Sequence, residues 1–155
     1  MKPQNLFCSI RKEWVAALPE EIVRQRLLLH MIDQKGFPAS LVAVEQLLGQ
    51  LPHLSTVDPR RVPKRRADII CFANRNHLLS SSVLHPLLLV ECKAIKLAPA
   101  VMSQVVGYNH FVGSSFIAVV NQDEIRTGWY DREKKDYMFV DYLPSYLELL
   151  KSLGN

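Results

Sequence analysis

The sequence is poor in cysteine and has no long apolar run. Its three cysteines, Cys8, Cys71 and Cys92, lie far apart and show neither zinc-site spacing nor the even number of a disulfide framework. The N-terminus lacks the apolar core of about 7–15 residues that a signal peptide needs. No stretch approaches the roughly 20 apolar residues that cross a bilayer. We therefore expect a cytoplasmic protein with reduced thiols and no membrane contact.

Internal repeats and low-complexity tracts are also absent, so 155 residues predict one ordinary domain, 1–155. With 48% hydrophobic and 22% charged residues, the composition is typical of a folded protein. The formal net charge is +4 and the sequence pI about 9.1. This mildly basic balance is compatible with a nucleic-acid partner but does not require one.

Apolar periodicity and Pro and Gly signals divide the chain into helices and strands. The predicted helices are 19–34, 99–112 and 144–155, and the predicted strands are 40–48, 67–73, 87–93, 115–121 and the hairpin 124–131 with 136–143. A loop, 49–63, and a polar turn, 74–86, connect the early strands. This order predicts an α/β sandwich with a central mixed sheet flanked by helices, in which helix 99–112 joins two parallel strands. Trp14 and Trp129 are expected in the core or half-buried.

The segment "LLLVECK", 87–93, is an apolar strand that ends in opposite charges. Glu91 and Lys93 share one face of it because side chains alternate with period two. Asp68 opens the preceding strand, so an antiparallel pair would bring all three together. Two carboxylates, with the backbone carbonyl of Cys92, suit a hard ion such as Mg²⁺, and the lysine suits a water or a phosphate. A structural ion pair at a sheet end is the competing interpretation.

Five segments, "LPEEIVRQRLLLHMI", "RRADIICFA", "PLLLVECKA", "QVVGYNHF" and "FIAVVNQD", extend this pattern. In this order they resemble the restriction-endonuclease-like PD-(D/E)XK superfamily, and within it the N-terminal nuclease domain of type I restriction enzyme R subunits. The resemblance covers about residues 18–122, and the hairpin and helix of 123–155 continue it.

The resemblance implies roles for particular residues. Asp68 and Glu91 would be metal ligands, Lys93 the catalytic lysine, and Glu21, or its neighbour Glu20, a further acidic residue of the metal site. Gln104 and Tyr108 match the family's Q-x-x-x-Y motif and would contact the DNA backbone from one helix face. Ala67 departs from the pattern, since the family's proline stands directly before the aspartate.

A basic run and a glutamate can each be interpreted in two ways. The run "RRVPKRR", 60–66, contains Lys64, Arg65 and Arg66, which either grip DNA phosphates beside the site or form a solvated loop. Glu45 either reaches inward or pairs across the sheet, and cross-strand pairing is favoured.

The residues and the resemblance together predict a metal-dependent nuclease that uses Mg²⁺ or Mn²⁺ and hydrolyses phosphodiester bonds, with DNA as the expected substrate and a restriction or repair role. Two alternatives remain open: a catalytically silent nucleic-acid-binding or assembly module, and a metal site without a nucleic-acid partner. The chain has no G-x-x-x-x-G-K-[ST] loop and therefore no helicase motor of its own. A homodimer stays open by analogy with related folds.

Overall fold

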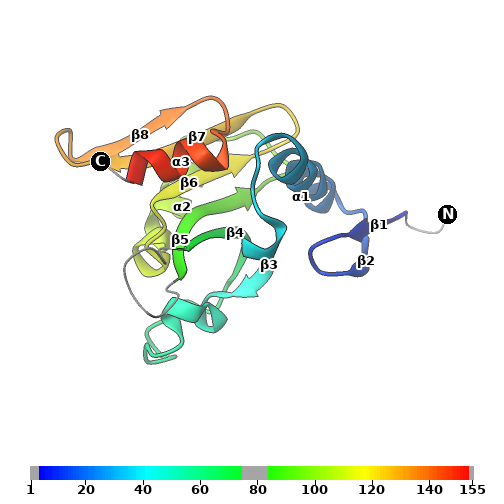
Figure 1. The fold of residues 1–155 in the computed structure, drawn as a ribbon, viewed down its shortest axis with the longest axis horizontal. Helices are drawn as coiled ribbons and strands as arrows, with labels where there is room; N and C mark the ends of the chain where they lie inside the picture. The colour runs from blue at the N-terminus through cyan, green and yellow to red at the C-terminus, as the bar shows by residue number, and fades with distance from the viewer. Residues whose placement is uncertain (1–3, 75–83, 154–155) are drawn as a thin grey trace.

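In the computed structural model, which describes residues 4–74 and 84–153, a six-stranded mixed sheet carries helices on both faces (Figure 1). The strand order is β3-β4-β5-β6-β7-β8. The strands of this sheet are β3 (Val42–Leu47), β4 (Arg66–Asn74), β5 (Leu84–Cys92), β6 (Phe116–Val120), β7 (Ile125–Asp131) and β8 (Asp136–Val140). Only β5 and β6 are parallel, and the predicted α/β architecture with a mixed sheet is confirmed.

The three predicted helices are present as α1 (Pro19–Leu29), α2 (Pro99–Val112) and α3 (Tyr146–Leu153). A π-helical turn, His30–Gln34, extends α1, and the chain then leaves the helix at Gly36, whose φ is 71°. Gly113 ends α2 with a φ of 69°. Both glycines adopt the left-handed conformation that terminates helices without a Cβ clash. Helix α2 connects β5 to its parallel neighbour β6, as predicted.

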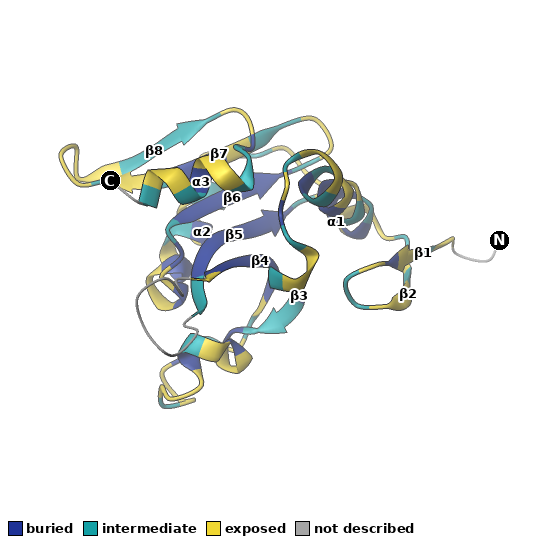
Figure 2. Cartoon of the chain, viewed as in Figure 1, coloured by how far each residue is buried: buried dark blue, intermediate teal, exposed yellow. Residues whose placement is uncertain are grey.

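Two apolar layers hold the helices on the sheet. Figure 2 shows the central strands β4, β5 and β6 as mostly buried. Alternate residues of β4 and β5 face opposite sides, so Ile69 and Val90 pack beneath α1 and α3 while Ile70 and Leu89 pack against α2. All four side chains are fully buried. Burial on both faces explains why these strands read as nearly continuous apolar runs in the sequence.

The pairing of β4 with β5 positions the charged residues. The two strands are antiparallel, with Ile69 opposite Val90, so Asp68 and Glu91 are the next residues at the same end of the pair. At the other end β5 starts at Leu84, not at 87 as predicted, and passes through Pro86, which lies opposite a bulge at Cys71/Phe72. A bulge accommodates a proline within a sheet because the ladder is already interrupted there. Most of the predicted turn, 75–83, lies outside the described residues.

A two-stranded hairpin, β1 (Asn5–Cys8) with β2 (Glu13–Ala16), precedes α1 and was not predicted. Cys8 anchors it in the core, whereas Phe7 and Trp14 pack edge to face on its outer side. Trp14 is 70% exposed, so its predicted burial is wrong. Trp129 is half-buried against the core, as expected. Among the described residues no helix is both long and apolar enough to span a bilayer.

Candidate active site

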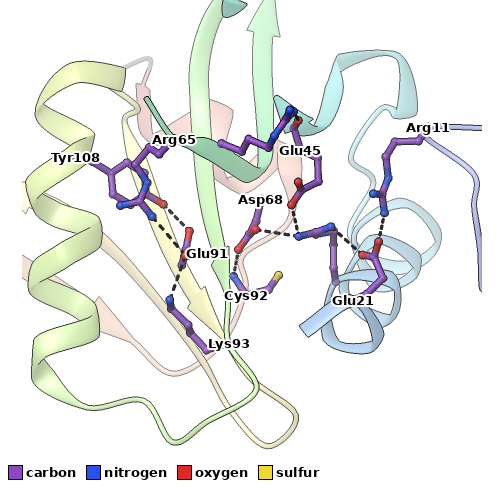
Figure 3. A network of polar contacts seen from close by, with 11 residues as sticks. Arg11, Glu21, Glu45, Arg65, Asp68, Glu91, Cys92, Lys93 and Tyr108 are labelled. Carbon is purple, nitrogen blue, oxygen red and sulfur yellow. Dashed lines mark hydrogen bonds and ion pairs between the residues drawn. The ribbon is translucent and has the colours of Figure 1, made fainter. Parts of the chain in front are cut away.

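Asp68 and Glu91 meet where β4 begins and β5 ends, as the antiparallel interpretation predicted. The backbone N–H of Cys92 donates to Asp68 Oδ2 at 2.7 Å, which ties the aspartate to the neighbouring strand. Figure 3 shows Asp68 in the middle of a polar network, with Glu91 on one side and Glu21 on the other.

Glu91 is buried and has three polar partners. The Tyr108 hydroxyl donates to Oε2 at 2.8 Å, and Lys93 Nζ lies 3.3 Å from Oε1. Arg65 lies 3.6 Å from the same oxygen, and its guanidinium stacks 3.8 Å above the Tyr108 ring. Burial, and then the negative charge of Asp68, raise the pKa of Glu91, and the three partners offset part of that rise. A nearby cation therefore stabilises the ionised form of Glu91.

Arg24 forms the other half of the network. Its buried guanidinium contacts Glu21 at 2.9 Å through Nη1, and Glu45 at 2.5 Å and Asp68 at 2.9 Å through Nη2. Arg11, from the loop of the N-terminal hairpin, pairs with the second oxygen of Glu21. Burial alone lowers the pKa of Arg24, but the charges of the surrounding carboxylates raise it overall, so this guanidinium is a permanent cation.

Glu45 is the residue of this network that sequence reasoning assigned differently. It lies between Val44 and Gln46, which pair with β4, yet its φ is +56°, an uncommon backbone conformation for a residue with a side chain. The Arg66 guanidinium holds the Glu45 carbonyl at 2.8 Å, and the carboxylate contacts Arg24. The expected cross-strand pairing is replaced by an inward ion pair. Its backbone conformation carries no clear signal in the sequence.

The other residues that the resemblance assigns to the site differ in how far they are buried. Lys93 pairs with Glu91, and Glu21 reaches Asp68 through Arg24, whereas Glu20 is exposed. Of the Q-x-x-x-Y pair on α2, Gln104 is exposed and Tyr108 is buried on Glu91. The DNA contact expected of that pair stays a prediction.

The basic residues of the run 60–66 also point to different surroundings. Arg65 turns toward Glu91, while Lys64 and Arg66 are exposed beside the site. A cavity of about 670 Å³ between α1 and the β6–β7 turn is lined by none of the candidate residues.

The oxygen atoms near Asp68 and Glu91 fit an Mg²⁺ site in which water supplies several of the ligands. The described residues contain no cluster of three or more His, Cys, Asp or Glu side chains placed to hold a metal, which argues against a closed cage within that part of the chain. Asp68 and Glu91 offer two carboxylates, and Mg²⁺ is ordinarily held by one or two carboxylates while it keeps several waters. The backbone carbonyl of Cys92 is the further oxygen expected there.

A family model described as the type I restriction enzyme R protein N terminus matches residues 19–144. The match begins at the first residue of α1 and ends just before α3, so it contains every strand of the six-stranded sheet and every acidic residue of the network. No curated protein and no solved structure matches the chain.

Proposed function

Because the chain belongs to the family of type I restriction enzyme R protein N-terminal domains, which gives it a restriction-related role, we propose that it is a metal-dependent nuclease acting on DNA. The observation that carries this proposal is the convergence of Asp68, Glu91 and Lys93 at one end of the β4–β5 pair. Asp68 pairs with Arg24, and Glu91 pairs with Lys93 and Arg65. The two carboxylates at this end of the strands also offer the oxygen ligands that a divalent cation binds.

In this proposal Asp68 and Glu91 hold Mg²⁺ or Mn²⁺. When bound, the ion supplies charge neutralisation at the scissile phosphate and lowers the pKa of a bound water. The chain fixes both carboxylates in advance: the Cys92 N–H orients Asp68, and the Tyr108 hydroxyl orients Glu91. Such prior orientation avoids a reorganisation cost during the reaction.

Lys93 is the residue that would act on the substrate. Its side chain is 21% exposed and its Nζ lies 3.3 Å from Glu91, so it is both anchored and accessible. It would position the attacking water and stabilise negative charge that develops on the phosphate. Lys64 and Arg66, exposed beside the site, and Gln104, exposed on α2, would contact the DNA backbone.

The test is cleavage of supercoiled plasmid and of single-stranded DNA with Mg²⁺ or Mn²⁺. Lys93→Ala is compared with Lys96→Ala, which removes an exposed lysine three residues further on. We expect metal-dependent nicking that Lys93→Ala abolishes and Lys96→Ala retains.

Two other results would redirect the proposal. Equal nicking by the wild type and Lys93→Ala would place the activity outside this site. Absence of nicking, with DNA binding that weakens steeply as salt rises, would identify a catalytically silent binding module, because phosphate contacts release counterions.

A further inference from the structure

One nitrogen of Arg24 lies where two carboxylates converge. Nη2 is 2.5 Å from Glu45 Oε1 and 2.9 Å from Asp68 Oδ1. Nη1 binds Glu21 at 2.9 Å, and the Arg24 side chain is only 8% exposed. Nη2 therefore places positive charge at the point where the Glu45 and Asp68 carboxylates converge.

The backbone of Glu45 indicates independently that this arrangement is built into the fold. A φ of +56° within a strand is costly for a glutamate, and the Arg66 guanidinium holds the carbonyl in that conformation. Glu45 lies between two residues that pair with β4, at the level of Asp68. The strained residue is therefore the one that faces Arg24 and the candidate metal ligand.

We propose that Arg24 is a positioning residue whose guanidinium occupies the place of a second metal ion beside Asp68. The inference rests on the proposed function: the nuclease site then holds a single Mg²⁺ or Mn²⁺, at Asp68 and Glu91. A second divalent ion next to Nη2 would meet a guanidinium that stays protonated at any working pH. The fixed charge also holds one oxygen of Asp68 in a defined orientation.

Glu21 and Glu45 act through Arg24 in this arrangement. Each oxygen of Glu21 is paired with an arginine, Arg11 or Arg24, so in this arrangement Glu21 supports the guanidinium. Glu45 balances the charge of the same nitrogen. The resemblance implies that Glu21 is a metal ligand, and the inference gives this residue a different role.

The test is the number of Mn²⁺ ions bound by the full chain, measured by calorimetry and by the Mn²⁺ paramagnetic resonance signal. Arg24→Gln is compared with Arg26→Gln, which removes an exposed arginine from the same helix. We expect one ion in the wild type and in Arg26→Gln, and two in Arg24→Gln. Adding Glu45→Gln to Arg24→Gln removes a ligand of the extra ion and returns the number to one. A purely structural role of Arg24 would not raise the number of bound ions.

Glu45→Gln alone tests the inference with Arg24 in place, which covers the case in which Arg24→Gln does not fold. Since Glu45 contacts the guanidinium and not the metal, we expect the Mn²⁺ affinity to fall by no more than the roughly 10–100-fold that residues outside the ligand sphere cause. A loss of more than about 100-fold would show that Glu45 is a metal ligand and would overturn the inference.

The remaining outcomes separate the inference from the proposed function. Two ions in the wild type, or one in both the wild type and folded Arg24→Gln, overturn the inference and leave the nuclease proposal standing. No ion in the wild type but one in Arg24→Gln supports the place of Arg24 and overturns the metal-dependent function. No ion in either protein overturns both.

Discussion

The hydrogen bond from Tyr108 to Glu91 offers a sharp test of how the site is held together. Tyr108→Phe removes only the hydroxyl, which donates to Oε2 at 2.8 Å, and keeps the ring on which Arg65 stacks. Hydrogen bonds to charged groups contribute about 1.5–3 kcal/mol, and the buried carboxylate has little water to replace the lost donor. We expect Tyr108→Phe to lower the free energy of unfolding by about that amount at pH 8.

In a domain of this size, about 1 kcal/mol corresponds to roughly 2–4 °C in Tm, so the expected loss is roughly 3–12 °C. The assay is thermal unfolding by circular dichroism in EDTA at pH 8 and at pH 4.5, the ordinary pKa of a glutamate. Because the fold raises the pKa of Glu91, this carboxyl is mostly neutral at the lower pH. A bond between neutral groups contributes about 0.5–1.5 kcal/mol, so the loss should shrink there.

Tyr130→Phe is the matched control, since Tyr130 is 52% exposed and the change should leave Tm nearly unaltered. If Tyr108→Phe behaves like this control at pH 8, the hydroxyl does not stabilise the charged carboxylate. An equal loss in Tm at both pH values would show that the effect does not depend on the charge of Glu91.

Four further predictions concern charge, packing and DNA binding. In EDTA, Glu91→Gln should raise Tm at pH 8, and this gain should disappear as the pH falls. Folding raises the pKa of Glu91, so ionisation of this carboxyl destabilises the folded protein as the pH rises. A constant difference in Tm between pH 4.5 and 8 would contradict this. Gly128→Ala should destabilise the β7–β8 pair by about 1–3 kcal/mol, because a Cβ there would lie 2.5 Å from the Phe139 ring. By contrast Gly107→Ala, in α2 with nothing within 4 Å, should stabilise the protein by roughly 0.5–1 kcal/mol in denaturant titration. Lys64→Ala should reduce the slope of log K for DNA binding against log salt by about 1; an unchanged slope would remove this lysine from the interface.

Most of the sheet was predictable because its central strands are buried on both faces. The apolar runs of β4 and β5 identified both strands, and glycines marked the ends of the first two helices. Two features of the fold were not predicted from the sequence. The start of β5 was hidden by Pro86, since a proline ordinarily excludes a strand unless a bulge receives it. The β1–β2 hairpin has strands of only four residues, too short for a clear alternation.

The site was predictable only where contact follows from strand pairing. Asp68 and Glu91 come together because their strands are antiparallel, and Lys93 follows Glu91 by alternation. Arg24 and Arg11 reach the site from a helix and a hairpin loop, and only the packing of those elements on the sheet brings them there. Tertiary packing of this kind leaves no fixed spacing in the sequence.

The charges of the network explain how so many ionised side chains are stable together in the folded protein. Four carboxylates face four basic side chains: Glu21, Glu45, Asp68 and Glu91 against Arg11, Arg24, Arg65 and Lys93. The formal sum is zero, so no carboxylate is left buried without a cation, which would be strongly destabilising. In the proposed function, a divalent ion at Asp68 and Glu91 would add two positive charges to this balanced set and would compete with Lys93 and Arg65 for Glu91. A DNA phosphate would bring negative charge to the same place. Metal and DNA should therefore each increase the affinity for the other, and by linkage both couplings are equal in free energy. In the proposed function, a metal at Glu91 would release Lys93, and this lysine would then contact the phosphate.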